Sequence, residues 1–265
     1  MGTAKKKRVR CPICGKYEIP TKDHVPPKSC NNKSDVVRKF IFPSINGTKK
    51  DRIIQGGLSF SYICPKCNND ILGAKTDKEL ADLYKVVFNS KEDIVAWEGN
   101  INNLVKSVFG HILATGEYSK VTYDKEMRLF VKKGILPERT HLYLLYYPYN
   151  DVFLIRTVIP FEYFNRATPV RKMNDNKIVS CFYFYPLAFI VADANYYSEA
   201  IDLIDALQNN QNKITLSKHS FSNPYTKNML PPCWPCQMGK QSEDDTVDAV
   251  LSGKEGVNAQ LVQKR

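Results

Sequence analysis

The chain has 265 residues, of which 43% are apolar and 11% aromatic, so it can bury a sizeable core, and we expect two domains. The sequence has no apolar run of about eighteen residues, and its basic N-terminus leads into CPIC without the apolar core of a signal peptide. We therefore expect no membrane span and no secretion, and a soluble, cytoplasmic protein. In that compartment eight cysteines favour metal binding over disulfides.

The net charge of +11 is concentrated at one end of the chain. Residues 1–90 hold 18 Lys and Arg against 8 Asp and Glu, a net charge of +10, which leaves +1 for the remaining residues. Clustered positive charge suits contact with a phosphate backbone, because neutralised phosphates release their counterions. The basic run at residues 5–10 is also typical of a solvated arm or a targeting signal.

The N-terminal third is predicted to be irregular at first and then helical. Residues 30–57 have turn signals at 46–47 and 56–57, so we expect an irregular insertion. A strand at 58–63 should lead into Cys64, and a short helical turn should follow the second cysteine pair and end near Gly73. The T-x-x-E pattern at Thr76 and Glu79 predicts a capping box and a helix over 77–89.

The remainder is predicted to be one long helix followed by a β-rich unit. A second capping signal at Ser90 and Asp93 and apolar residues at helical spacing predict a bridging helix over 91–115. β-branched and aromatic residues then predict strands at 119–133, 140–149, 151–160 and 178–193. A helix at 197–208 and a strand at 213–218 follow. We expect the Pro-rich, polar residues from 220 onward to be loosely packed.

The predicted fold class is therefore α+β. The division that we expect is a metal-stapled N-terminal domain (1–90), the bridging helix (91–115), a β-rich α+β unit (116–219) and a tail (220–265). The β-rich unit is nearly neutral and aromatic-rich. It could fill a core with these aromatics or use them to form a homodimer or bind a protein partner.

Paired C-x2-C spacing predicts a structural zinc site. Each pair can present two sulfurs from one tight turn, so two pairs complete a tetrahedral set. The predicted ligands are Cys11, Cys14, Cys64 and Cys67. The alternative is four unrelated buried cysteines. A third pair, Cys233 and Cys236, lacks a partner pair, and Cys181 or His219 could complete a second zinc site with it.

The residues between and after the two pairs add a further motif. Asp23-His24-Val25-Pro26-Pro27 lies between them, and Asn68 directly follows the second pair. This ordered combination resembles the zinc-bearing branch of the HNH nuclease family, over about residues 10–90. The resemblance implies a ββα-metal fold. One departure is Ser59, which stands where family members carry an asparagine that pins a loop.

The resemblance also implies an activity. It implies a metal-dependent endonuclease that hydrolyses phosphodiester bonds of DNA, in the setting of bacterial anti-phage defence or restriction. His24 would be the general base, and Asp23 and Asn68 would hold Mg²⁺ or Mn²⁺, which prefer such hard oxygen ligands. Asn68 could instead cap the helix that follows, and Asn69 is a rival ligand.

Other residues have weaker signals. Lys16, Lys22 and Lys28 are candidates for contacts with phosphates that flank the cut, or are ordinary solvated lysines. His111 and His141 are expected to be ordinary core or surface residues. Two alternatives to a nuclease remain: a non-catalytic, zinc-stabilised nucleic-acid-binding protein, and a protein whose β-rich unit recruits a partner.

Overall fold

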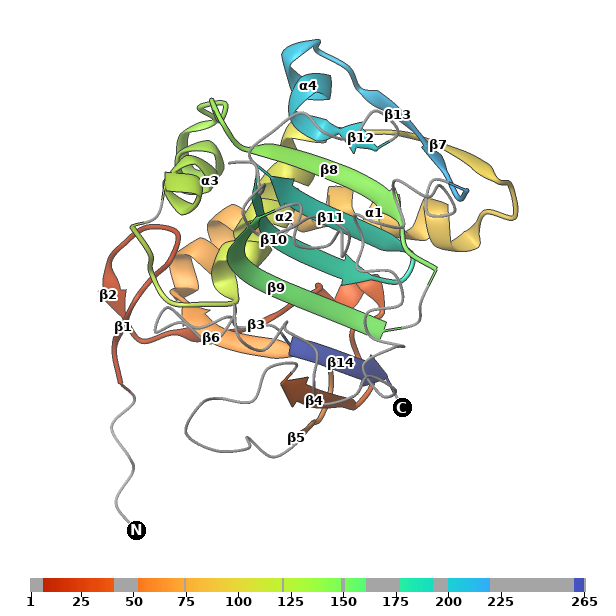
Figure 1. Ribbon diagram of the computed structural model, residues 1–265. Coiled ribbons are helices and arrows are strands. Elements are labelled where there is room, and N and C mark those ends of the chain that lie inside the picture. Colours follow the sequence, from red (N-terminus) through yellow and green to blue (C-terminus); the bar gives the residue numbers. More distant parts are fainter. Residues whose placement is uncertain are drawn as a thin grey trace.

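The computed structural model describes residues 7–40, 52–73, 75–120, 122–148, 151–160, 177–192, 200–219 and 260–264. In 36–40, 52–54, 151–160, 177–179 and 260–264 the backbone alone is described. Helices and strands are mixed, which confirms the α+β prediction (Figure 1). None of the helices in these ranges combines the length and apolar character that crossing a membrane requires.

Two short antiparallel pairs surround the first cysteine knuckle. Strands β1 (Val9–Arg10) and β2 (Tyr17–Glu18) flank it, and β3 (Thr21–His24) pairs with β6 (Ser59–Ile63), which confirms the predicted strand before Cys64. A 3-10 turn, η1 (Lys28–Cys30), follows β3. The predicted irregular insertion is wrong in part, because it contains β4 (Val36–Phe40) and β5 (Arg52–Ile54), paired with each other. Residues 41–51 of the insertion lie outside the described residues.

A helical segment follows the second knuckle, as predicted. It consists of the π-helix η2 (Cys67–Leu72) and helix α1 (Thr76–Asn89). The predicted capping box is wrong, because the Thr76 hydroxyl donates to the carbonyl oxygens of Ile71 and Leu72, at 2.9 and 2.7 Å. Glu79 instead accepts a hydrogen bond from the Asn100 amide at 3.1 Å, so it ties α1 to a later segment.

The bridging helix predicted over 91–115 is wrong in its first half. Strand β7 (Ile94–Glu98) precedes helix α2 (Ile101–Ala114). Val95 and Trp97 are buried and alternate with exposed neighbours, which is the period of a strand. Helix α2 begins only at Ile101, and it is capped by Asn100, whose side-chain oxygen accepts from the Asn103 amide at 2.9 Å.

The strand predicted at 119–133 is also wrong. Helix α3 (Thr122–Lys133) occupies most of this segment. Its buried residues include Tyr123, Met127, Phe130 and Val131, which fall at i, i+4, i+7 and i+8 and so line one face of a helix. In this segment the helical spacing of the buried residues outweighs the strand propensity of the side chains.

The β-rich part forms one antiparallel sheet. It contains β8 (His141–Tyr146), β9 (Asp151–Pro160), β10 (Lys177–Phe184), β11 (Leu187–Ala192), β12 (Ile201–Asp202) and β14 (Gln260–Lys264). The order along the sheet is β12-β8-β11-β10-β9-β14-β4-β5. The predicted strands at 140–149 and 151–160 are confirmed, whereas the strand predicted at 178–193 is two strands, β10 and β11.

The last described elements differ from prediction in extent and pairing. Helix α4 (Leu203–Gln208) is shorter than the helix predicted over 197–208, of which residues 197–199 lie outside the described residues. Strand β13 (Lys213–Ser217) confirms the predicted strand, but it pairs with β7 in a separate ribbon. The tail predicted to be loosely packed, 220–265, lies outside the described residues except for β14, where the prediction is wrong because this strand pairs with β4 and β9.

Helices α1 and α2 lie behind the sheet in Figure 1. Tyr84 of α1 stacks on Phe184 of β10 with ring centroids 6.4 Å apart, and one buried core extends from the first knuckle to β13. Gly110 of α2 allows a close approach to η2, because a Cβ at Gly110 would lie 2.0 Å from a Leu72 methyl carbon. The second knuckle is thereby held against the central helix.

Candidate functional site

The four predicted zinc ligands meet in the structure. The sulfur atoms of Cys11, Cys14, Cys64 and Cys67 lie within 4.8 Å of one another. Cys14 Sγ and Cys64 Sγ are 3.7 Å apart. Tetrahedral zinc with Zn–S bonds of about 2.3 Å would hold two sulfurs about 3.8 Å apart. The cluster therefore fits a structural zinc ion.

The surroundings of the cluster favour a thiolate. The Gly15 amide donates to the Cys11 carbonyl at 2.9 Å and closes a tight turn, in which Gly15 has a φ of 78° that favours glycine. A hydrogen bond from the Cys67 thiol lowers the pKa of Cys11 to about 4, and the same bond raises the pKa of Cys67. Burial raises the pKa of Cys64. A bound cation would compensate this buried negative charge.

Strand β3 positions the Asp-His pair. Asp23 is buried, and His24 is half-buried. The Gly56 backbone forms a hydrogen bond with the His24 ring, while its Nε2 atom is buried and has no hydrogen-bond partner among the described residues. Burial, and then the charges of Lys28 and Lys22, lower the pKa of His24. The lowered pKa favours the neutral imidazole of His24.

Asn68 lies against the same strand. Its side-chain Nδ2 donates to Thr21 Oγ1 at 3.1 Å and to the Lys22 carbonyl at 3.5 Å. The residue that precedes η2 is Lys66, and no side-chain hydrogen bond caps this helix, so Asn68 is not a helix cap. Asn69 is exposed. The geometry therefore associates Asn68, rather than Asn69, with β3.

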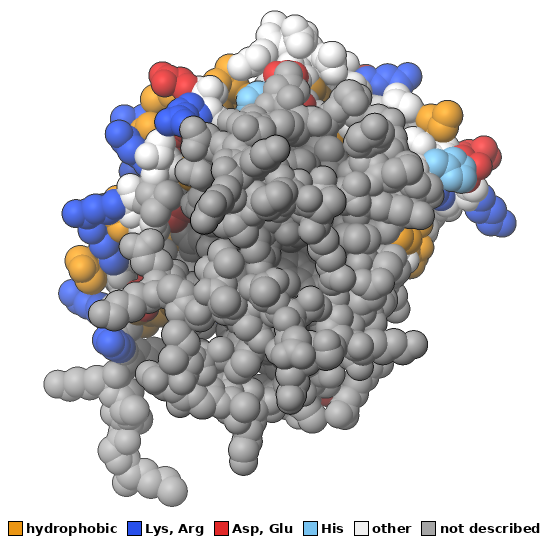
Figure 2. Space-filling view, in the orientation of Figure 1, with side chains coloured by type: hydrophobic (Ala, Val, Ile, Leu, Met, Phe, Trp, Pro, Cys, Tyr) orange, Lys and Arg blue, Asp and Glu red, His pale blue; other side chains and the backbone are white. Residues whose placement is uncertain are grey.

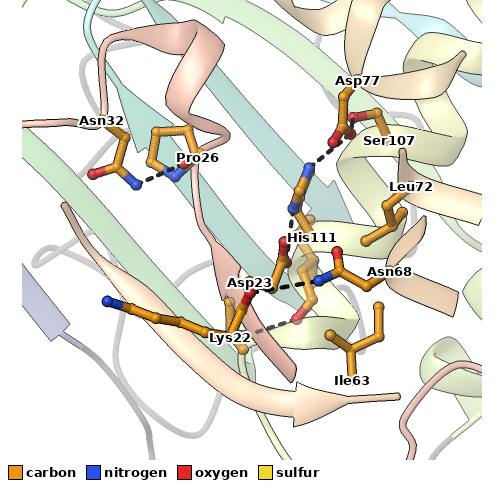
Figure 3. A network of polar contacts seen from close by, with 12 residues as sticks. Lys22, Asp23, Pro26, Asn32, Ile63, Asn68, Leu72, Asp77, Ser107 and His111 are labelled. Atoms are coloured by element: carbon orange, nitrogen blue, oxygen red, sulfur yellow. Dashed lines mark hydrogen bonds and ion pairs between the residues drawn. The ribbon is translucent and has the colours of Figure 1, made fainter. Parts of the chain in front are cut away.

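A carboxylate–histidine–carboxylate network contacts Asp23, with Asp23 and His111 buried and Asp77 half-buried. The Oδ2 atom of Asp23 lies 3.1 Å from His111 Nδ1, and Oδ1 of Asp77 lies 2.9 Å from His111 Nε2 (Figure 3). The Ser107 hydroxyl donates to Asp77 at 2.8 Å. Burial of His111 lowers its pKa, but Asp77 and Asp23 outweigh this effect and raise it to about 10. Both ring nitrogens of His111 thus face carboxylate oxygens, which favours the protonated imidazole.

The expectation that His111 is a core or surface residue holds, because it is fully buried, but its two carboxylate partners were not predicted. His111 is fully buried in α2 and reaches Asp23 on β3. One signal in the sequence was available: Ser107 and His111 are four residues apart within an otherwise apolar helix, so they share a face. Two polar residues on one side of a buried helix need partners.

Asn32 pins the loop that follows His24. Its Nδ2 donates to the carbonyl oxygens of Pro26 and Leu58, at 2.6 and 2.8 Å, and its Oδ1 accepts from the Leu58 amide at 2.8 Å. Gly57, with a φ of 97°, passes so close that a Cβ there would lie 2.2 Å from the Asn32 carbonyl oxygen. A buried asparagine thus holds this loop, although Ser59 occupies the position where the family resemblance places one.

The remaining candidates are dispersed. Lys22 and Lys28 are exposed and act electrostatically on His24, whereas exposed Lys16 belongs to the first knuckle, where its carbonyl accepts from the Cys11 amide at 2.8 Å. Cys233 and Cys236 lie outside the described residues. Burial in β10 raises the pKa of Cys181 to about 12.

Two histidines have acidic partners at other places. His219 Nε2 lies 3.2 Å from Asp93 Oδ2 at the surface, and His141 Nδ1 lies 2.5 Å from Asp202 Oδ2 beside α4. Neither group adjoins β3. The structure therefore brings the four cysteines together and holds Asn68 against β3, which carries Asp23 and His24, whereas Cys181, His141 and His219 lie on other elements.

Comparisons with protein-family models, with curated proteins and with solved structures find no match. The side chains of the protein itself are therefore what points to a function.

Proposed function

We propose that this chain is a metal-dependent endonuclease of the HNH type that hydrolyses phosphodiester bonds of DNA. The observation that carries the proposal is that Asn68, the residue after the second knuckle, hydrogen-bonds to β3, the strand that carries Asp23 and His24. The antiparallel pair β3–β6, followed by η2 and α1, supports a ββα arrangement.

The donor set suits a hard divalent cation. Within the described part of the chain, Asp23 Oδ1 has no hydrogen-bond partner, and Asn68 turns its amide nitrogen toward β3, so both residues have an oxygen available. These residues would hold Mg²⁺ or Mn²⁺. When bound, such a cation would neutralise charge on the phosphate and on the leaving oxygen.

His24 would act as the general base. Nε2, the ring nitrogen without a partner among the described residues, would accept the proton of a water molecule that attacks phosphorus. The cationic His111, held by Asp77, would keep the Asp23 carboxylate in one orientation, which is a positioning role. A zinc ion at the four cysteines would be structural, and it would join the knuckle that precedes β3 to the knuckle that precedes Asn68.

Cleavage of supercoiled plasmid by the full chain tests the proposal. We expect nicked or linear product with added Mg²⁺ or Mn²⁺ and none without it. His24→Ala should lower the rate about 10²- to 10⁴-fold while zinc content stays unchanged. The matched control is His219→Ala, which removes a surface histidine and should cut at the wild-type rate. Equal cleavage by both variants would show that His24 is not the base.

A further inference from the structure

A basic cavity lies between the first cysteine knuckle and helix α3. It has a volume of about 350 Å³, and the side chains at its edge include Lys120, Lys125, Arg128, Lys132 and Lys133. Ile13, Cys14, Tyr118 and Leu129 complete its lining, so none of its described lining residues is acidic. We propose that this cavity is a binding site for the phosphate backbone of DNA, separate from the candidate active site.

The arrangement of the cations favours an extended polyanion. Lys125, Arg128 and Lys132 are spaced i, i+3 and i+7 and so lie on one face of α3. Seven residues of α-helix extend about 10 Å, which exceeds the size of a single phosphate group. A row of this length matches consecutive phosphates of a nucleic-acid strand.

Stability of the helix does not explain this row. Lys132 and Lys133 lie in the last turn of α3, where cations complement the helix dipole, but Lys125 lies near the other end, where a cation is unfavourable. Among the described residues, no ion pair joins Lys120, Lys125 or Lys132 to a carboxylate. The ammonium groups of Lys120, Lys125 and Lys132 are therefore available to an anionic ligand.

The cavity is held rigidly beside the knuckle. The guanidinium carbons of Arg10 and Arg128 lie 3.8 and 4.3 Å from the ring centroid of Tyr118, so this ring connects β1 to α3. Phe130 of α3 packs edge-on against Phe109 of α2, with ring centroids 5.8 Å apart. Phe109 lies two residues before His111 in the sequence. Figure 2 shows Lys and Arg side chains along the edge where Figure 1 places α3 and β2.

The identification of the ligand as DNA rests on the proposed function, and binding can be tested without cleavage. The experiment measures the affinity of the full chain for a short labelled DNA duplex, without added divalent cation, between about 50 and 200 mM salt. The test variant is Lys125→Gln with Lys132→Gln. The control variant is Lys91→Gln with Lys213→Gln, which makes the same change in net charge beside the β7–β13 ribbon.

The test variant should bind at least about ten-fold more weakly near 100 mM salt, and its slope of log affinity against log salt should be shallower by about 1.8. The control variant should bind as the wild type does. Equal weakening in both variants, or in neither, would overturn the site. ATP binding by the wild type and by the test variant would be measured as well. If the test variant loses ATP binding but keeps its DNA affinity, the cavity is a site for a free nucleotide and the proposed DNA site is overturned. Failure of the wild type to cleave plasmid would instead count against the proposed function alone.

Discussion

The cysteine cluster and the Asp23–Asn68 site lie close together in the sequence, but they are built differently. The cluster draws four ligands from two knuckles and is complete within them. The proposed Asp23–Asn68 site would offer two oxygen ligands, and Asp23 is contacted by His111 from α2, which in turn contacts Asp77 from α1. A closed sulfur site suits structure, whereas an open oxygen site leaves room for water and substrate.

This difference predicts different consequences when ligands are removed. Loss of sulfur ligands should affect folding, because metal binding and folding are coupled in such knuckles. Loss of oxygen ligands should affect chemistry and leave the zinc in place.

The largest effect is expected from the cysteines. Replacing Cys11 and Cys64 by Ala should remove the zinc and unfold the N-terminal part, because a structural zinc contributes about 10 kcal/mol or more. The matched control replaces Cys30 and Cys181, two buried thiols outside the cluster. Elemental analysis and thermal unfolding would measure both variants. An undiminished zinc content in the first variant would contradict the assignment.

The next effect separates the two carboxylates of the network. Asp23→Asn and Asp77→Asn each remove one negative charge from His111, but only the first changes a proposed metal ligand. We expect more than about 100-fold loss of plasmid cleavage for Asp23→Asn and about 10- to 100-fold for Asp77→Asn. Zinc content should be normal in both. Equal losses at every Mn²⁺ concentration would argue that Asp23 is only structural.

His111→Gln should raise the Mn²⁺ concentration for half-maximal cleavage about 10- to 100-fold, because Asp23 loses the cation that orients it. The maximal rate at saturating Mn²⁺ should recover much of the wild-type value. A metal titration of cleavage distinguishes this positioning role from a general loss of fold, which would lower the maximal rate without shifting the titration.

The smallest effect is expected from Asn68, for which the neighbouring Asn69 serves as the control. Asn68→Ala should weaken metal binding about ten-fold and be partly rescued by raised Mn²⁺, because an exposed site can replace one neutral ligand with water. Asn69→Ala should behave as the wild type, since this exposed side chain lies outside the β3 contacts. The reverse result would assign the ligand to Asn69.

The parts of the site that could be predicted are those with local spacing. Each cysteine knuckle is recognisable within four residues, and the Asp-His pair and Asn68 are recognisable from their order around the knuckles. The partnership of Asp23 with His111 crosses 88 residues, and no spacing rule encodes it. Asn32 was missed for a related reason, since its partners Pro26 and Leu58 are joined only when the loop closes.

The fold was predicted best where the spacing of the apolar residues fits either a helix, with its period of about 3.6 residues, or a strand, with its period of about 2, but not both. Segment 94–98 satisfies both periods, because Ile94, Trp97 and Ile101 fit a helix while Val95 and Trp97 fit a strand. Pairing with β13, which is remote in sequence, decides in favour of the strand. In α3 the balance is reversed, because packing against α2 favours the helix over strand propensity.

The sheet also buries most of the aromatic residues that were candidates for an interface. Tyr143, Tyr147, Phe182, Tyr183 and Phe184 are buried, and Tyr146 and Tyr185 are half-buried. A dimer or a protein partner through residues 116–219 stays a prediction, and these side chains offer it little exposed area.

The distance along the chain between Asp23 and His111 has a consequence for synthesis. A ribosome releases β3 long before α2, so the proposed metal ligand is made 88 residues ahead of the histidine that orients it. Nascent chains and truncated products that end before α2 should therefore lack an ordered Asp23 and be catalytically silent. The order in which the segments emerge would then delay nuclease activity until the central helix has docked.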